Sequence, residues 1–210
     1  MTPFSATECI RFGWETFKKR PWFFIGSYLL YLVVISVISV ALNEFITYGG
    51  LASFVGTLAR VAVEMLAGMG GVAFALKAHD DVEHVSLADF WHPSPFWKYT
   101  VATLLYGLIF LVGLVLVIIP GIIWGIMFGF AGYFIIDKNM WPIEALKASK
   151  HITYGHKWEL FLLGILSFLI VALGFICILV GLLVAAPVVL FAFAHAYRTL
   201  EGKAAPVPTM

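Results

Sequence analysis

Hydrophobic residues along the chain gather into six long apolar runs, separated by short segments that hold most of the charged residues. A helix needs roughly 20 predominantly apolar residues to cross the hydrocarbon core of a bilayer. We therefore predict an all-α polytopic membrane bundle with about six transmembrane helices. The predicted spans cover residues 23–43, 51–76, 99–119, 121–136, 160–180 and 182–197, of which the fourth and the sixth are the shortest.

The connections between the later spans are very short. Only Pro120-Gly121 separates the third span from the fourth, and the fifth meets the sixth at Gly181. Pro and Gly at the two central positions are typical of a type II turn. We therefore expect each of these pairs to form a tight antiparallel hairpin, with the turn at Pro120-Gly121 in one case and at Gly181 in the other.

A similar stretch of sequence precedes each pair of spans. It is a short amphipathic segment with aromatic residues, followed by a tryptophan and the first helix of the pair. Trp97 and Gly113 are separated by the same number of residues as Trp158 and Gly174. We predict three parallel repeats, each an amphipathic interfacial helix followed by a two-helix hairpin. The repeats start near Phe12, Ala88 and Ile152, and the first interfacial helix falls within residues 4–20.

The basic residues give a strongly one-sided pattern. Cytoplasmic loops of membrane proteins are enriched in Lys and Arg. Placing the N-terminus in the cytoplasm puts all of the 13 Lys and Arg residues except Arg60 on the cytoplasmic side, while the outer connections carry only Glu44. We predict a multi-pass protein of the bacterial inner membrane with both termini cytoplasmic. Tryptophans suited to anchor the helices at that interface are Trp22, Trp97, Trp141 and Trp158.

Composition agrees with this class. Of the 210 residues, 62% are hydrophobic and 12% are charged, whereas a soluble domain has about a quarter charged. We predict one integral membrane domain over 1–210, with a flexible tail at 201–210 and the lipid bilayer as its surroundings. A net charge of +1 argues against nucleic-acid binding. The N-terminus also fits a signal peptide cleaved near Ser39-Val40-Ala41, but the apolar run is longer than such a peptide requires.

Two charges lie inside the second predicted span. Arg60 and Glu64 are spaced i and i+4, which places them on one helix face within ion-pair reach. Charges within a membrane normally face the bundle interior or a cavity and mark function. Three interpretations stay open: a self-neutralised pair that fixes the orientation of the helix, a polar cavity or substrate site, and a contact with a partner protein.

Small residues recur at helical spacing on two spans, and such faces allow close helix contact within the bundle or with another subunit. We expect the second span to be central in the bundle. On that span the packing positions are Gly56 and Gly68 in the row of the ion pair, and Ala67, Gly71 and Ala75 beside it. On the fourth span they are Gly121, Gly125 and Gly129.

Other polar residues give weaker signals. The loop from His79 to His84 groups two histidines with three carboxylates that are able to ligate a metal, yet its spacing matches no closed site and fits a solvated loop. His195 is either a proton relay or, by preference, a histidine that snorkels to the interface. No nucleotide loop, HExxH motif or catalytic triad pattern stands out. We expect no enzymatic activity, no bound metal and no cofactor.

Residues 95–200 carry a family resemblance. The runs IIPGIIWGIMFGFAGYFIID and PIEALKASKHITYGHKWELF resemble a broad group of uncharacterised bacterial six-helix membrane proteins, which are similar to the membrane domain of some glycerophosphodiester phosphodiesterases. The pattern includes Asp137, Ser149, Gly155 and Trp158. The catalytic barrel of those enzymes has no counterpart here, so the resemblance implies an architecture and no phosphodiesterase activity.

Three functions fit these observations, in order of preference. The first is a non-enzymatic scaffold or accessory subunit, because the predicted packing faces suit a membrane protein partner or a homo-oligomer. The second is a transporter or channel that uses Arg60 and Glu64. The third is a lipid-handling protein in which the amphipathic segment 143–153 reaches lipid headgroups, with Lys147, Lys150 and Lys157 near anionic phosphates.

Overall fold

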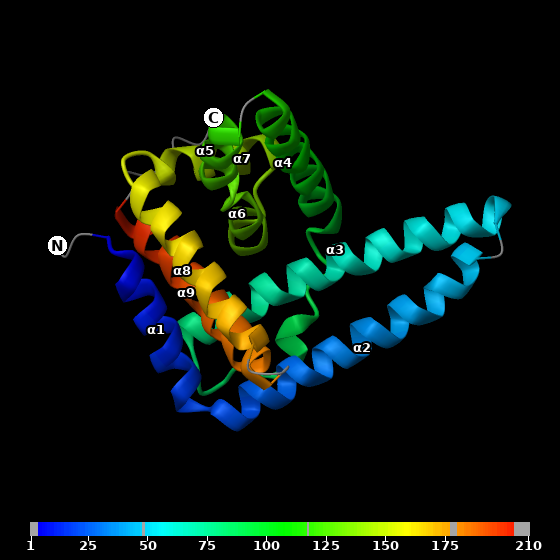
Figure 1. Cartoon of the computed structure of the whole chain (residues 1–210), viewed down its shortest axis with the longest axis horizontal. Helices are drawn as coiled ribbons and strands as arrows, with labels where there is room; N and C mark the ends of the chain where they lie inside the picture. Colours follow the sequence, from blue (N-terminus) through cyan, green and yellow to red (C-terminus); the bar gives the residue numbers. More distant parts are fainter. Residues whose placement is uncertain (1–3, 48, 117, 177–179, 204–210) are drawn as a thin grey trace.

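A computed structural model describes residues 4–47, 49–116, 118–176 and 180–203 (Figure 1). Within these ranges the chain is helical and contains no strand, which confirms the predicted all-α class. The elements are α1 (Ala6–Lys19), α2 (Pro21–Thr47), α3 (Gly50–Asp80), the 3₁₀ helix η1 (Leu87–Phe90), α4 (Phe96–Leu116), α5 (Ile118–Phe128), α6 (Ala131–Lys138), α7 (Pro142–Thr153), α8 (Lys157–Ile176) and α9 (Val180–Lys203).

Six segments of the described chain are long and apolar enough to span a membrane, as the hydropathy pattern predicts. They cover Pro21–Glu44, Gly50–Asp80, Phe96–Val115, Ile119–Lys138, Lys157–Ile176 and Gly181–Lys203. The last span is longer than predicted because α9 continues to Lys203. Residues 201–203, predicted to belong to a flexible tail, are therefore helical, and the rest of that predicted tail lies outside the described residues.

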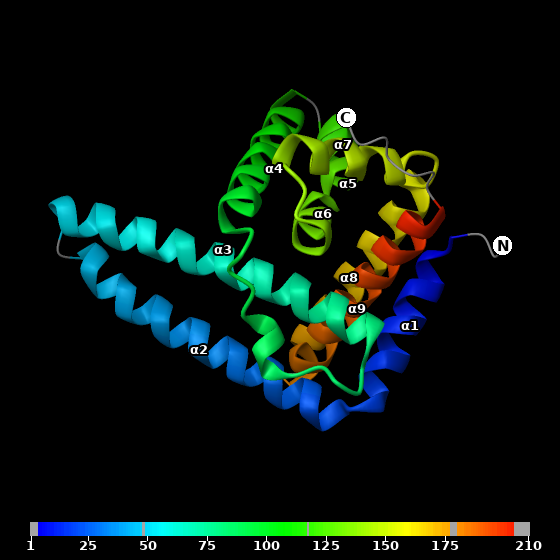
Figure 2. The same ribbon diagram turned by 180° about the vertical axis from the view of Figure 1, so that it is seen from behind.

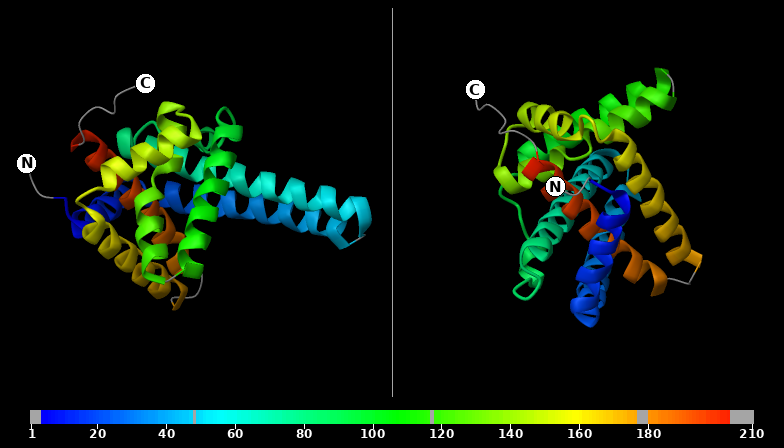
Figure 3. Two further views of the ribbon diagram at one scale, coloured as in Figure 1. Left: turned by 90° about the horizontal axis from the view of Figure 1, so that it is seen from above. Right: turned by 90° about the vertical axis from the view of Figure 1, so that its left-hand side faces the viewer.

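The helices α2 and α3 form a long antiparallel pair that projects to one side of the molecule (Figures 1 and 2). Near the body the pair is firmly held: the Tyr31 hydroxyl donates to the Ala67 carbonyl at 2.6 Å. The 3₁₀ helix η1 crosses α3 so closely that a Cβ at Gly70 would lie 2.2 Å from the Phe90 carbonyl oxygen. Further out, large apolar side chains are exposed, including Phe54. The second span is thus central only in its C-terminal half, and the view from above shows the projection clearly (Figure 3, left).

The N-terminal helix α1 packs into the protein core. Its apolar face includes Cys9 and Phe17, both buried. The helix lies so close to α9 that a Cβ at Gly13 would be 2.3 Å from the Val188 carbonyl oxygen. The predicted amphipathic helix is present, and its apolar face is covered by protein because α9 lies alongside.

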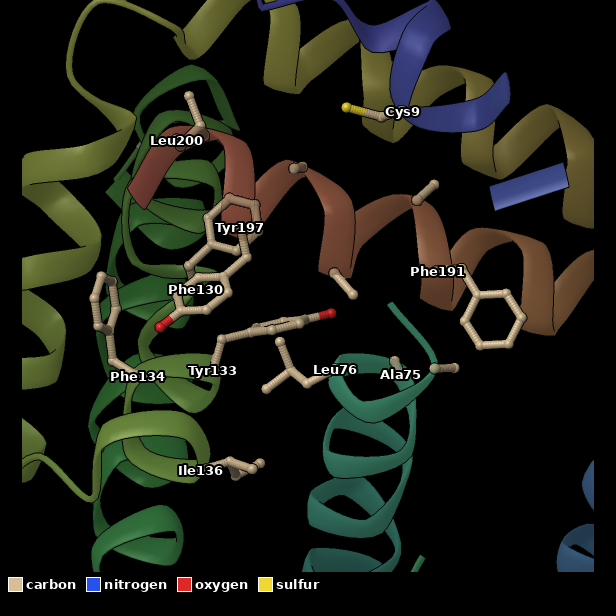
Figure 4. Packing of buried hydrophobic residues seen from close by; sticks show 14 of the residues in the cluster. Cys9, Ala75, Leu76, Phe130, Tyr133, Phe134, Ile136, Phe191, Tyr197 and Leu200 are labelled. Carbon is tan, nitrogen blue, oxygen red and sulfur yellow. The ribbon is translucent and has the colours of Figure 1, made fainter. Parts of the chain in front are cut away.

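Aromatic residues of α6 and α9 form the centre of the core (Figure 4). The Tyr197 ring meets the Phe134 ring edge-on at 5.1 Å and lies 5.4 Å from the Tyr133 ring. Leu76 of α3 is buried in the same cluster. Helices from three parts of the chain are therefore joined by one apolar cluster.

The repeat is less regular than predicted. The second hairpin follows the single turn of η1 and a loop, in place of an amphipathic α-helix. Pro93 and Pro95 lie in that loop, and proline disfavours the helical conformation in the residue before it and donates no backbone hydrogen bond. A helix over this segment is therefore excluded by its own sequence.

The two predicted turns are also in the wrong place. Pro120 and Gly121 lie in the first turn of α5, and Gly181 lies in the first turn of α9. Proline is tolerated in the first turn because backbone N–H groups there have no helical partner. The glycines serve close approach instead: a Cβ at Gly113 would be 2.9 Å from the Gly121 Cα, and one at Gly174 would be 2.8 Å from the Gly181 carbonyl oxygen. This contact explains why Gly113 and Gly174 recur in the repeats.

The fourth span is interrupted between α5 and α6. Gly129 and Phe130 lie at this break, so the predicted continuous face of Gly121, Gly125 and Gly129 ends at Phe128. The hydroxyl of Ser149 on α7 accepts the Phe130 N–H at 3.1 Å and donates to the Met127 carbonyl at 2.9 Å. Irregular backbone within a membrane protein requires such partners, because lipid offers none.

The bridge at the break predicts the effect of Ser149→Ala. The substitution removes the partner of the buried Phe130 N–H and one of the two hydroxyl donors to the Met127 carbonyl, and an unsatisfied buried group costs about 1–3 kcal/mol. We expect a clear decrease in the free energy of unfolding, measured by denaturant titration in mixed micelles. The matched control is Ser167→Ala, because Ser167 is also buried but its hydroxyl has no hydrogen-bond partner among the described residues. Equal stability of the two variants would contradict the role of Ser149.

The close crossing in the third hairpin predicts a difference between two glycines of α8. Gly174→Ala places a methyl group 2.8 Å from the backbone of α9, whereas Gly164 has open space around its Cβ position. We expect Gly174→Ala to lower the melting temperature in detergent and Gly164→Ala to leave it unchanged or raise it, since alanine favours helices. Equal melting temperatures for Gly174→Ala and Gly164→Ala would contradict a tight contact between α8 and α9 at Gly174.

Candidate functional site

Arg60 and Glu64 form an ion pair on the outside of the projecting hairpin. Arg60 Nε lies 3.1 Å from Glu64 Oε1, and the two side chains are 46% and 54% exposed. Their neighbours Thr57 and Val61 are exposed as well. The i,i+4 spacing predicted this ion pair correctly, but about half of each side chain is exposed, so the pair faces outward.

The predicted small-residue positions have different surroundings. A Cβ at Gly68 would lie 2.9 Å from the Tyr99 hydroxyl of α4, and one at Gly125 would lie 3.1 Å from the Phe110 ring. Gly56 and Ala75 are buried, and Ala67 accepts the hydrogen bond from Tyr31. At Gly71 no described atom lies within 4 Å of the Cβ position, so this residue makes no close helix contact within the described part of the chain.

A second polar group, which we call the base network, joins the ends of α3, α6 and α9. Arg198 lies at its centre: Nε and Nη2 donate to the two oxygens of Asp80 at 3.1 and 2.6 Å, and Nη1 donates to Asp137 Oδ2 at 2.8 Å. The Tyr197 hydroxyl donates to the same Asp137 oxygen at 2.9 Å. A two-point guanidinium–carboxylate contact fixes direction as well as distance, so Arg198 holds three helices in register.

Two histidines extend the base network. His79 Nδ1 lies 3.0 Å from Asp80 Oδ1, and His79 Nε2 lies 3.1 Å from His195 Nδ1. A carboxylate only accepts, so His79 donates to Asp80 and, when neutral, accepts from His195. The His195 ring also stacks on Phe12 of α1 at 4.0 Å. The preferred interpretation, a histidine snorkelling to the interface, is therefore wrong, because its partners lie inside the protein.

The loop after α3 is held by its own side chains. Asp81 Oδ1 accepts the backbone N–H groups of Glu83 and His84 at 3.2 and 3.3 Å, and its other oxygen lies 2.8 Å from His84 Nδ1. These hydrogen bonds outweigh the partial burial of the carboxyl group and lower its pKa. Among the described residues, no three His, Cys, Asp or Glu side chains are grouped so as to hold a metal ion.

A cavity of about 310 Å³ adjoins the base network and is lined partly by Asp80, Asp137 and Arg198. Two of its carboxylates, Asp80 and Asp137, pair with Arg198. Asp89 accepts hydrogen bonds from Ser86. The ion pairs of Arg198 beside this cavity join α9 to α3 and α6.

Little in the sequence indicated the base network. In the sequence, Arg198 contributed only to the prediction of topology, and Asp80 was only one of three carboxylates in the loop from His79 to His84. The two lie more than a hundred residues apart, so no local spacing joins them. A usable signal was that Asp137 and Arg198 each directly follow a predicted apolar span, where a charge is costly unless it is paired.

The base network predicts a loss of stability in Arg198→Ala. Removing one member of a largely buried ion pair leaves its carboxylates uncompensated and typically costs about 3 kcal/mol. We expect a lower free energy of unfolding in mixed micelles. The control is Arg11→Ala, which removes an exposed i,i+4 pair with Glu15 and should change stability little. Similar free energies of unfolding for Arg198→Ala and Arg11→Ala would show that the ion pairs of Arg198 do not stabilise the fold.

Comparison with known proteins gives distant relatives. The chain is 28% identical over 153 residues to the uncharacterized protein Rv2560 of Mycobacterium tuberculosis and to the uncharacterized protein Mb2590 of Mycobacterium bovis. The match covers 73% of this chain and 47% of each relative, so the chain spans less than half the length of the curated relatives it matches. No family model and no solved structure matches, and the resemblance to phosphodiesterase membrane domains finds no support. The protein is thus a multi-pass helical membrane protein, similar to uncharacterized mycobacterial proteins.

Proposed function

We propose that this protein is a non-enzymatic component of a membrane assembly, either a scaffold or an accessory subunit, and that its α2–α3 hairpin contacts another membrane protein. The observation that carries the proposal is the outward-facing ion pair of Arg60 and Glu64 on the projecting half of α3. The proposal also takes the membrane to be the bacterial cytoplasmic membrane, with both termini in the cytoplasm, on the basis of the one-sided distribution of Lys and Arg.

The energetic reason is the cost of charge in lipid. A charged side chain at the centre of a membrane helix costs about 3 kcal/mol on insertion scales. Pairing within one helix offsets part of this cost, but about half of each side chain stays exposed. A partner that covers this face with polar or charged groups would remove the remaining contact with lipid and gain hydrogen bonds to both residues.

The neighbourhood of the pair supports a contact surface. Thr57 lies one turn before Arg60 on the same face and is also exposed. Its hydroxyl donates to the Ser53 carbonyl at 2.8 Å, so it adds polarity to the face without an unsatisfied donor. The flanking apolar residues Leu58 and Val61 are exposed. This mixture of apolar area around a central charged pair is common in protein interfaces.

A transporter is the less favoured function. Substrate paths across membranes use charged residues that face an interior or water-filled cavity, whereas Arg60 and Glu64 face outward. The polar residues of the base network pair with one another and offer no open path. For the same reason we propose no catalytic role for them.

The proposal predicts the result of site-specific photo-crosslinking in native membranes. A photo-reactive amino acid at Thr57 should give one discrete protein adduct, whereas the same group at the exposed Leu108 of α4 should react with lipid. The adduct should disappear in Arg60→Ala/Glu64→Ala and in the exchange Arg60→Glu/Glu64→Arg. The exchange keeps an ion pair within α3 but reverses the charges that a partner meets.

The exchange variant separates the two interpretations of the pair. A pair that only neutralises itself tolerates the exchange, and position 57 then reacts with lipid in every variant, which would contradict the proposal. Mild-detergent purification followed by mass spectrometry identifies the adduct: a second copy of this chain indicates a homo-oligomer, and another protein indicates an accessory subunit.

A further inference from the structure

A groove of about 570 Å³ lies between the start of α4 and the start of α7, away from the projecting hairpin. Its walls include Val101 and Leu105 on α4 and Ile143 on α7. Trp97 and Trp141 flank it and are 76% and 65% exposed. Because Trp97 stands at the first turn of the span Phe96–Val115, the mouth of the groove is at the level of a membrane interface and its apolar wall runs into the span.

The charged groups of the groove lie at the same end. Lys98 Nζ donates to the carbonyl oxygen and the side-chain oxygen of Asn139 at 2.8 and 2.9 Å, and lies 4.9 Å from the centre of the Trp141 ring. An ammonium group has three donors, so one N–H of Lys98 stays available. Lys147 also lines the groove and has no hydrogen-bond or ion-pair partner in the described part of the chain.

One carboxylate offsets these charges in part. Glu144 lines the groove, and its carboxylate accepts the backbone N–H of Trp141 at 3.3 Å. Two ammonium groups against one carboxylate leave the mouth of the groove with net positive charge. The groove therefore combines a cationic mouth, two indole rings and an apolar wall, which together match a phosphate group attached to an acyl chain.

We propose that this groove binds one anionic phospholipid, with its phosphate between Lys98 and Lys147 and the first part of an acyl chain along Val101 and Leu105. A lipid fits the groove better than a protein segment because the polar and apolar parts are separated along the membrane normal, as they are in a phospholipid. Indole rings at this level favour the interfacial region of a bilayer, and basic residues there attract anionic headgroups.

The third hairpin repeats the same combination of residues. A second groove of about 430 Å³ between α5 and α8 is lined by Lys157 and Trp158 at its mouth and by Ile122, Ile126 and Phe161 along its wall. Trp158 occupies the position in its repeat that Trp97 occupies in the second hairpin. The α4–α7 groove is the stronger of the two sites because it has two lysines in place of one.

The test uses the full chain in detergent, native mass spectrometry, and an equimolar mixture of phosphatidylglycerol and phosphatidylcholine with identical acyl chains. We expect one bound lipid, with phosphatidylglycerol preferred. Lys147→Ala should reduce that preference about fivefold, the contribution of one lysine near a lipid surface, and Lys147→Arg should restore it. The matched control is Lys150→Ala, one turn further along the exposed face of α7 and outside the groove.

Several results would overturn the proposal. Equal binding of the two lipids shows that the groove does not read the headgroup charge. An equal loss of the preference for phosphatidylglycerol in Lys147→Ala and Lys150→Ala shows that the basic face of α7 attracts anionic lipids in general, without a specific site. Displacement of the lipid by soluble glycerol phosphate at equal concentration shows a phosphate site without an acyl-chain site. Since Arg60 and Glu64 lie on a different part of the protein, failure here leaves the hairpin proposal standing, and the reverse also holds.

Discussion

The hydroxyl of Ser149 satisfies the backbone at the one place where a membrane-spanning segment of the described chain is broken, and much of the fold depends on it. Water is absent from the apolar region, so an open N–H or carbonyl there must find a partner within the protein. Ser149 supplies both an acceptor and a donor at the break between α5 and α6. Because Ser149 stands on α7, the same bridge pulls the amphipathic helix α7 into the core.

Two further features follow from this arrangement. The break allows α6 to leave the line of α5, which brings Asp137 at its last turn to Arg198 and Tyr197 of α9. With the inner face of α7 fixed against the core, its opposite face with Ile143 and Lys147 lies free beside α4 and forms the groove. The helix break, the base network and the proposed lipid site are thus linked through α7 and α6, although their residues are far apart in the sequence.

The two groups of charges in the membrane-spanning helices differ in what surrounds them. Arg198 has carboxylate partners from two other helices and is mostly buried, so its charge is compensated within the protomer. Arg60 has one partner, on its own helix, and both side chains are about half exposed. This contrast is the reason for assigning stability to the first group and a contact with a partner to the second. The Arg198 ion pairs join different helices within the body of the protein, whereas the ion pair on the outer half of the hairpin lies within α3 alone.

The sequence by itself determined the all-α class, the six apolar spans and the i,i+4 pairing of Arg60 with Glu64, because hydropathy and helical spacing are local properties. It also contained the repeat of Gly113 and Gly174, but not the reason, since the contact with Gly121 and Gly181 depends on where α5 and α9 begin. Pro120 was taken for a turn because local preference does not distinguish a turn from the first turn of a helix. Only the tertiary structure decided whether lipid or protein covers the apolar faces of α1 and α7, where Ser149 finds its partners, and which carboxylates meet Arg198. An amphipathic pattern predicts that one face of a helix is buried, but only the tertiary structure shows whether protein or lipid buries it.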